Sequence, residues 1–311
     1  METQQITLLP DFIIIGAGKA GTTSLYHYLD QHQDIFMSKV KEPNFFALEG
    51  EHLDHQKEDP KQLNHYPWAV TDLQQYCDLF KDASPTQSKG EASTMYLYSK
   101  KAAEGIQNRC PEAKLMVVLR QPAERLYSRY LHLARENRTP TDDFADVLKK
   151  DNIYWERQDL VPSGFYADHL SYYFNRFDRN QIMVIFHEEL LNNPHKVMEQ
   201  VNDFLNLSPY NYDYNKKFNK SGYIKNKKLD KLFGQNSVVK SSLKKAAPAV
   251  FRFIKKQRIV KKFVGDLRDN NLHRPKLDKS LKMQITNDIY REDIDKLEQL
   301  LNINLDHWKQ F

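Results

Sequence analysis

The sequence predicts a three-layer α/β fold, in which a central parallel sheet is flanked by helices. Three observations support this prediction. Short apolar runs rich in β-branched residues recur along the 311 residues, as in the buried strands of a parallel sheet. Segments with helical periodicity alternate with these runs, which is typical of α/β proteins. The first run leads into a glycine-rich turn and a helix, an arrangement like that of a P-loop.

Each strand is predicted from a short apolar run, and KLMVVL is the clearest of these runs. The expected strands are Phe12–Ile15, Ile35–Met37, a strand end within Gly90–Tyr98, Lys114–Leu119 and Gln181–Phe186. The expected helices are Thr22–His32, Leu73–Phe80, Ala102–Asn108, one beginning near Pro122, Phe144–Lys150, Tyr166–Phe177, Pro194–Leu205 and Lys279–Leu301. Proline is tolerated best in the first turn of a helix, which supports the two helices that begin at prolines. Residues 49–70 are polar and are predicted to be irregular.

Composition narrows the class of protein. A membrane-spanning helix needs about 18 or more consecutive apolar residues, and the sequence has no such run. The first ten residues, METQQITLLP, lack the basic and apolar regions of a secretory signal, so we expect a cytoplasmic protein. Cys77 and Cys110 do not have metal-ligand spacing and are expected to be reduced thiols. With no internal repeat or low-complexity linker, residues 1–311 are predicted to form one domain.

Positive charge is concentrated in one segment. The net charge is +5, but residues 216–262 contain sixteen Lys and Arg and one acid, Asp230. Such a block implies an anionic partner. We expect residues 216–268 to form a basic helical segment, as a candidate subdomain. Three interpretations stay open: a surface that contacts anionic lipid, a rim that binds an acidic glycan, or a subdomain with solvated lysines. No nucleic-acid-binding motif accompanies the charge, so nucleic acid is not an expected partner.

The glycine turn GAGKAG, which begins at Gly16, fits the dinucleotide-binding pattern G-x-G-x-x-G. That pattern requires an Asp or Glu at the end of a second strand, about twenty residues further on. Here the second apolar run ends in Ser38 and Lys39 instead. The glycine pattern alone is a weak signal, and the context that would confirm a dinucleotide site is missing.

The same turn is nearly a P-loop. Gly16 and Gly21 have the right separation, but Thr22 stands where the P-loop lysine should follow, and Lys19 lies inside the turn. A P-loop NTPase also needs an Asp after a later strand to hold magnesium, whereas KLMVVL ends in Arg120. The residues therefore predict a phosphate loop that works without a metal, and a second phosphate site at Arg120. Ser128, two helical turns beyond Pro122, either reaches this second anion or is a helix-surface residue.

Three motifs together, GAGKAGTTSL, KEPNFF and LRQPAERLYSRY, resemble the sulfotransferases that use 3′-phosphoadenosine 5′-phosphosulfate (PAPS). The K-x-G-T-T form is most similar to the heparan sulfate branch and its bacterial relatives. SGFYADHLSYYFNRF, IMVIFHEELLNNP and LEQLLNINLDHW are similar to bacterial members, so the resemblance spans nearly the whole chain. It implies an enzyme that transfers a sulfuryl group, without a metal, to a hydroxyl or amine of a carbohydrate, lipid or small metabolite.

The resemblance also implies roles for individual residues. The implied donor-binding residues are Lys19, Ala20, Gly21, Thr22, Thr23 and Ser24 at the 5′-phosphosulfate, Arg120 and Ser128 at the 3′-phosphate, Tyr166 near the nucleotide, and Lys220, Ser221 and Gly222 in a loop over the 3′-phosphate. Lys19 is also expected to stabilise charge on the leaving phosphate oxygen. The NKSG stretch that holds the last three departs from the K-G-R and R-K-G forms of the superfamily.

A base is needed to remove the proton from an acceptor hydroxyl as it attacks sulfur. In the heparan branch a Glu in a K-E-x-x-F-F context has this role, which implies Glu42 here. Some relatives carry His where this chain has Asn44. Lys41 and Glu91 are implied on the acceptor side. Without the resemblance, Glu42 would be interpreted as a surface carboxylate paired with Lys39 or Lys41.

Two other classes of function compete with this prediction. A P-loop kinase would explain the glycine turn, although the missing lysine and aspartate argue against it. A non-catalytic protein that binds a nucleotide or anionic lipid would explain the basic residues. The presence of both Lys19 and Glu42 argues against this class.

Overall fold

In the computed structural model, the described residues are 8–53, 68–135, 138–215, 223–224, 272–273 and 275–310. Backbone contacts divide the chain into two compact units. The first comprises residues 1–129, 143–219 and 278–311, and the second comprises 130–142 and 220–277. In the second unit, β6 (Tyr223–Ile224) pairs antiparallel with β7 (Leu272–His273). The predicted loop residues Lys220, Ser221 and Gly222 and most of the basic segment 216–268 lie outside the described residues.

The described part of the first unit is built on a five-stranded parallel sheet with strand order β2-β3-β1-β4-β5. The strands are β1 (Phe12–Gly16), β2 (Ile35–Met37), β3 (Ser88–Ala92), β4 (Lys114–Leu119) and β5 (Ile182–Phe186). The chain places β2 and β3 on one side of β1, and then crosses to place β4 and β5 on the other. Ligands of such sheets bind at the carboxyl ends of the strands, where the strand order reverses. Here that position lies between β1 and β4.

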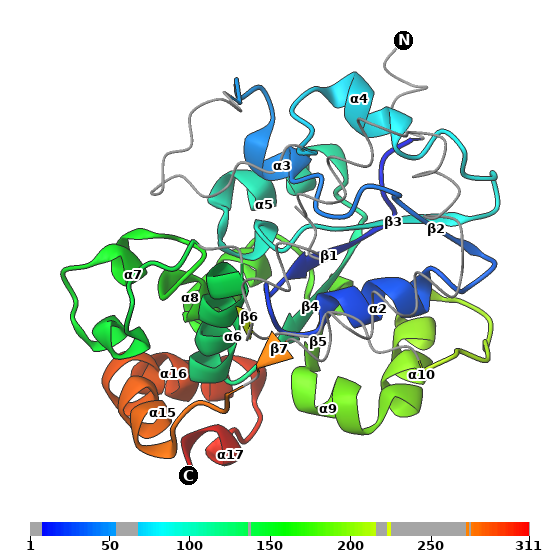
Figure 1. The fold of residues 1–311 in the computed structure, drawn as a ribbon. Coiled ribbons are helices and arrows are strands. Elements are labelled where there is room, and N and C mark those ends of the chain that lie inside the picture. Colours follow the sequence, from blue (N-terminus) through cyan, green and yellow to red (C-terminus); the bar gives the residue numbers. More distant parts are fainter. Residues whose placement is uncertain are drawn as a thin grey trace, which may run out of the picture. The chain divides into compact units, whose positions relative to one another are not determined.

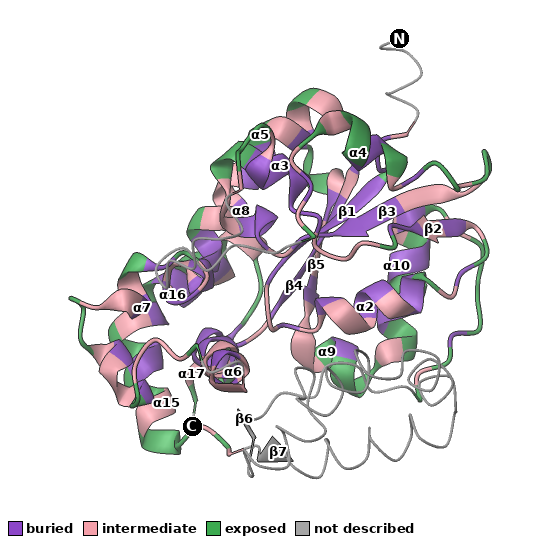
Figure 2. Ribbon diagram, turned by 45° about the horizontal axis from the view of Figure 1, so that its top comes forward, coloured by how far each residue is buried: buried purple, intermediate pink, exposed green. Residues whose placement is uncertain are grey.

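Helices cover both faces of this sheet. Figure 2 shows α2 and α10 on one side of the strands and α5 and α8 on the other. The helices are α2 (Thr22–Leu29), α3 (Phe45–Leu48), α4 (Leu73–Asp78), α5 (Lys100–Arg109), α6 (Pro122–Arg135), α7 (Ile153–Glu156), α8 (Tyr166–Phe174), α9 (His187–Asn192), α10 (Pro194–Leu205), α15 (Lys279–Ile285), α16 (Arg291–Leu301) and α17 (Asp306–Lys309). The predicted class, a parallel sheet flanked by helices, is confirmed (Figure 1). No described helix has both the length and the apolar content needed to span a bilayer.

Some elements differ from the sequence prediction. The expected helix Lys279–Leu301 is interrupted by a π-helical turn, Thr286–Tyr290, between α15 and α16. The expected helix Phe144–Lys150 is a 3₁₀ helix over Phe144–Leu148. The short helices α3, α7, α9 and α17 were not predicted, because four to six residues are too few to show a helical period.

The core lies around β1 and β4, whose apolar side chains are almost entirely buried (Figure 2). Phe12 of β1 and Gly90 of β3 are register partners. A Cβ atom on Gly90 would lie 2.1 Å from the Phe12 ring, so the close packing of these two strands depends on glycine at this position.

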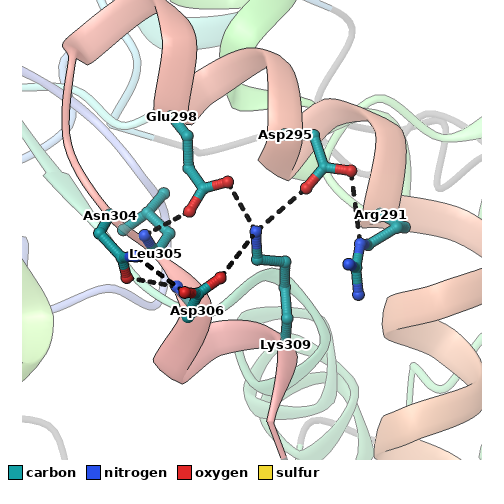
Figure 3. A network of polar contacts seen from close by, with 7 residues as sticks. All are labelled: Arg291, Asp295, Glu298, Asn304, Leu305, Asp306 and Lys309. Carbon is teal, nitrogen blue, oxygen red and sulfur yellow. Dashed lines mark hydrogen bonds and ion pairs between the residues drawn. The ribbon is translucent and has the colours of Figure 1, made fainter.

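Ion pairs of Lys309 join helix α17 to α16. Its ammonium group contacts Glu298 at 2.6 Å, Asp295 at 3.1 Å and Asp306 at 3.2 Å (Figure 3). The adjacent Trp308 is buried, and its backbone carbonyl accepts a hydrogen bond from the side chain of Gln121 at the start of α6. The end of α17 is thereby held against the carboxyl end of β4.

Candidate functional site

The carboxyl edge of the sheet brings together residues from all five strands. Across the edge, in the order of the strands, lie Glu42 after β2, Glu91 near the end of β3, Lys19 after β1, Arg120 after β4 and His187 after β5. All of these except His187 were predicted from the sequence. Of the predicted ones, Glu42, Lys19 and Arg120 follow a strand directly or within a few residues, and Glu91 lies inside its strand. Parallel strands place all of these positions on one edge, although they are far apart in the sequence.

The turn between β1 and α2 has the backbone of an anion-binding loop. Lys19 and Gly21 both have left-handed conformations, with φ of 70° and 107°. Gly21 precedes α2, and its carbonyl accepts the N–H groups of Ser24 and Leu25. The first N–H groups of a helix lack intrahelical partners, and they lie at the positive end of the helix dipole. The predicted residues Thr22 and Thr23 form this first turn. The start of α2 therefore favours a phosphate or phosphosulfate group.

Two side chains from neighbouring strands hold the carbonyl groups of this loop. The Arg120 guanidinium donates to the Lys19 carbonyl at 3.4 Å, and His187 Nδ1 donates to the Ala20 carbonyl at 2.8 Å. Burial, and secondarily the charge of Arg120, lowers the pKa of His187, so the ring is neutral at pH 7 with its proton on Nδ1. Both carbonyl oxygens therefore have hydrogen-bond donors within the protein.

Arg120 also borders a cavity of about 300 Å³. The cavity is lined by Arg120, Gln121, Glu124, His187, Glu188, Leu191, Asn192, Lys282, His307 and Trp308. Within it, Glu124 contacts Arg120 at 3.2 Å and Lys282 at 2.7 Å. Arg120, which was predicted to bind a second phosphate, thus lines a pocket that adjoins the loop after β1, and in this pocket two cations contact one carboxylate.

Two other residues were predicted to bind the sulfuryl donor. One of them lies beside this pocket, and the other lies on α6. The Tyr166 hydroxyl donates to the Arg120 carbonyl at 2.9 Å, which places Tyr166 beside the pocket. Ser128 is buried on α6, the helix that follows Arg120. Among the described residues, no three His, Cys, Asp or Glu side chains converge as metal ligands would.

The predicted base lies in a tight turn between β2 and α3. Glu42 has a left-handed backbone, with φ of 60°, and its carboxylate pairs with Lys41 at 2.9 Å. Both side chains are about one-fifth exposed, so the carboxylate can be reached from solvent. Lys39 pairs with Asp82 instead. Asn44 also has a left-handed backbone, and its buried side-chain amide has no partner within the described part of the chain.

Glu91 is placed differently from the other predicted site residues. Its side chain is fully buried, and its carboxylate accepts hydrogen bonds from Tyr76 and Ser93 at 2.9 and 2.8 Å. Burial raises the pKa of Glu91 to about 7, and the hydrogen bonds only partly offset this effect. In this structure, the carboxylate predicted on the acceptor side lies beneath the surface rather than on it.

The end of β3 links the predicted base, Glu42, to the loop after β1. Ala92 accepts the Glu42 N–H at 2.8 Å, and Ser93 donates its N–H to Ile14 of β1 at 3.0 Å. A Cβ atom on Gly18 would lie 3.4 Å from Thr94 Oγ1. Residues 92–94 therefore contact the turn that carries Glu42 on one side and β1 with its loop on the other.

Comparisons with known proteins agree with this arrangement. Residues 9–262 match the sulfotransferase domain family. The bifunctional heparan sulfate N-deacetylase/N-sulfotransferase 4 of Mus musculus is 30% identical over 218 residues, which cover 66% of this chain and 23% of that protein. Carbohydrate sulfotransferase 15 of Homo sapiens is 27% identical over 260 residues, which cover 66% of this chain and 45% of that protein. The chain thus spans less than half the length of these relatives.

A solved structure agrees over a larger share of the chain. The sulfotransferase from Alicyclobacillus acidocaldarius superposes with a TM-score of 0.69 and 25% identity, covering 97% of this chain and 99% of that one. The resemblance predicted from the sequence motifs is confirmed by the family match, which extends over most of the 311 residues. From its sequence, its sheet and its phosphate loop, this chain belongs to the sulfotransferase domain family.

Proposed function

We propose that the protein is a sulfotransferase that moves a sulfuryl group from PAPS to a hydroxyl group of an acceptor. The observation that carries this proposal is the contact of Arg120 with the phosphate loop itself, at the Lys19 carbonyl. It sets a cationic pocket directly beside an anion-binding helix start. A donor with one anionic group at its 5′ end and another at its 3′ position fits two adjacent anion sites.

In this proposal the phosphate loop holds the 5′-phosphosulfate. The loop residues are Lys19, Ala20, Gly21, Thr22, Thr23 and Ser24. Arg120 and Ser128 bind the 3′-phosphate, and Tyr166 supports Arg120 through its backbone carbonyl. Bidentate arginine suits a phosphate that must be fixed in one orientation.

The chemistry requires a proton acceptor and charge stabilisation. The acceptor oxygen forms a bond to sulfur while the bond from sulfur to the bridging oxygen of the donor breaks. The acceptor proton passes to the Glu42 carboxylate, and Lys19 stabilises the negative charge left on the departing phosphate. Positioning and electrostatic stabilisation supply most of the rate enhancement in such transfers, as in phosphoryl transfer.

The acceptor approaches from the β2 side of the sheet edge, where Lys41 and Glu42 are partly exposed. Relatives named for heparan sulfate and for carbohydrate support a saccharide acceptor. Lys41 lies beside the proposed base and is the cation that would meet an acidic saccharide there.

The proposal is tested by incubating the protein with sulfur-labelled PAPS and a panel of saccharides, with and without a chelator. Transfer that survives chelation supports the proposal, and Glu42→Gln should abolish transfer while PAPS binding is kept. Glu51→Gln, at a carboxylate paired with Lys101, is the matched control and should transfer normally. Magnesium-dependent transfer from ATP in place of PAPS would overturn the proposal in favour of a kinase.

A further inference from the structure

Glu91 has no direct part in the proposed reaction, although it is one of the few fully buried carboxylates of the described chain. We propose that Glu91 is a positioning residue, which fixes the proposed base Glu42 through the Ser93 hydroxyl and the backbone of Asn44. The path is continuous. Ser93 Oγ donates to Glu91 Oε2 at 2.8 Å, and the same oxygen accepts the Asn44 N–H at 3.0 Å.

The turn that carries the base needs such support. Glu42 and Asn44 have φ values of 60° and 56°. The left-handed conformation costs roughly 1–2 kcal/mol for a residue other than glycine, and asparagine tolerates it better than glutamate does. Two strained residues on either side of Pro43 persist only when surrounding contacts determine their backbone.

Besides the two bonds that the Asn44 carbonyl accepts from α3, three hydrogen bonds join this turn to other segments. Ala92 accepts the Glu42 N–H at 2.8 Å, and Pro43 accepts the Val70 N–H at 2.8 Å. The third is the bond from Asn44 to Ser93, and it is the one of the three that depends on a side chain. The side-chain amide of Asn44 makes no bond within the described chain that could replace it.

The carboxylate determines which way the Ser93 hydroxyl points. A hydroxyl has one proton to donate and can rotate to suit its partners. Because the Ser93 proton is directed to Glu91, a lone pair of the same oxygen faces the Asn44 N–H. The other carboxylate oxygen is held by the Tyr76 hydroxyl at 2.9 Å, so the carboxylate cannot turn away from Ser93. The Tyr96 hydroxyl also contacts both Glu91 and Ser93, so loss of the carboxylate weakens the preferred orientation of the Ser93 hydroxyl and does not abolish it.

This inference rests on the proposed function, since it needs Glu42 to be the base. It differs from a substrate-contact role in one measurable way. A residue that never touches the acceptor but sets the position of the base should change kcat far more than KM, because small displacements of a catalytic group can reduce rates by up to about 100-fold.

Ser93→Ala and Glu91→Met break the path at its two side chains. We expect each to lower kcat by about 10- to 100-fold, with KM and the affinity for adenosine 3′,5′-bisphosphate (PAP) changed less than about twofold. Glu91→Gln keeps an acceptor oxygen for Ser93 and should restore most of the rate. Tyr76→Phe is the matched control, because it removes a bond to the same carboxylate without touching the path to Asn44. It should lower kcat less than Ser93→Ala does.

A double-mutant cycle separates positioning from a general loss of structure. In a Glu42→Gln background there is no base to position, so adding Ser93→Ala should change the residual rate less than about twofold. An equal fall in both backgrounds, or a Ser93→Ala enzyme with the wild-type kcat, would overturn the inference. If Glu42→Gln itself keeps the wild-type rate, the assignment of the base fails instead, and this outcome is distinct because it does not depend on Ser93 or Glu91.

Discussion

His187 Nδ1 donates a hydrogen bond to the carbonyl oxygen of Ala20 at 2.8 Å. The bond joins the end of β5 to the loop after β1, although β4 lies between these two strands in the sheet. The loop is thus held by a side chain from another strand. The imidazole also lies close to Gly21, because a Cβ atom on Gly21 would lie 3.0 Å from the same nitrogen. The shape of the phosphate loop thus depends on a residue that lies 167 positions further along the chain.

His187→Ala should weaken PAP binding about threefold to tenfold. The loss corresponds to one hydrogen bond, which contributes about 0.5–1.5 kcal/mol. Isothermal titration calorimetry measures it directly. His195→Ala is the control, since His195 lies against Tyr214 and is a solvent-exposed histidine of α10. Equal binding by the wild type and His187→Ala would mean that the loop keeps its shape without this bond.

Arg120→Ala should distinguish between two nucleotides. Affinity for PAP should fall about 10- to 100-fold, because hydrogen bonds to charged groups contribute about 1.5–3 kcal/mol. Affinity for adenosine 5′-monophosphate should fall no more than about threefold, because Arg120 contacts the phosphate loop only through the 3.4 Å hydrogen bond to the Lys19 carbonyl. The same titrations with both ligands check this. Parallel losses for the two nucleotides would place the 3′-phosphate away from Arg120.

Gly90→Ala should lower the free energy of unfolding by about 1–3 kcal/mol, the usual range for overpacking a core. The added methyl group would meet the Phe12 ring at 2.1 Å, and that ring is fully buried. Urea denaturation followed by circular dichroism measures the change. Phe12→Leu makes room, so the double variant should lose less stability than the two single variants combined. Strict additivity would show that the Phe12 ring is not what the methyl group displaces.

The contribution of Glu91 and Asp293 to stability should decrease as pH rises from about 4 to about 7. Burial raises the pKa values of Glu91 and Asp293 to about 7. Each carboxyl therefore keeps its proton in the folded state at pH values where the unfolded chain has released it. Unfolding then releases protons, so its free energy falls with rising pH, by at most about 1.4 kcal/mol per pH unit for each group.

Asp293→Asn provides the check on this pH dependence. Its carboxylate accepts the Ala167 N–H at 3.1 Å, at the start of α8. The variant should show a shallower fall in urea midpoint between pH 4.5 and pH 7. Asp288→Asn, at an exposed position, should keep the wild-type slope. An unchanged slope in Asp293→Asn would mean that its carboxyl does not titrate in this range.

The sheet and the phosphate loop could be predicted because their signals are local. The run KLMVVL gives β4 with its observed bounds, and the glycines with Lys19 identify the turn after β1. Arg120 was found because it stands directly after a strand. The same reasoning would have found His187, which follows β5, but histidine after a strand matches no phosphate-loop template.

The surroundings of Glu91 could not be predicted in the same way. Its partner Tyr76 belongs to α4, fifteen residues earlier, and Ser93 reaches across to Asn44, 49 residues earlier. Nothing in GEASTMY indicates that its carboxylate is buried, because burial depends on how α4 packs over the end of β3. The sequence pattern identified an acidic residue of interest, whereas its role depends on contacts between distant segments.

The contact between Gln121 and the Trp308 carbonyl, 187 residues apart, has a consequence for biosynthesis. A chain emerging from the ribosome completes its phosphate loop, β4 and Arg120 long before α17 is made. The wall that Trp308 and His307 contribute to the cavity beside Arg120 is added only when the last of these residues has been synthesised and Lys309 has closed onto α16. This cavity is therefore completed only after both the phosphate loop and its contact residue His187 have been synthesised.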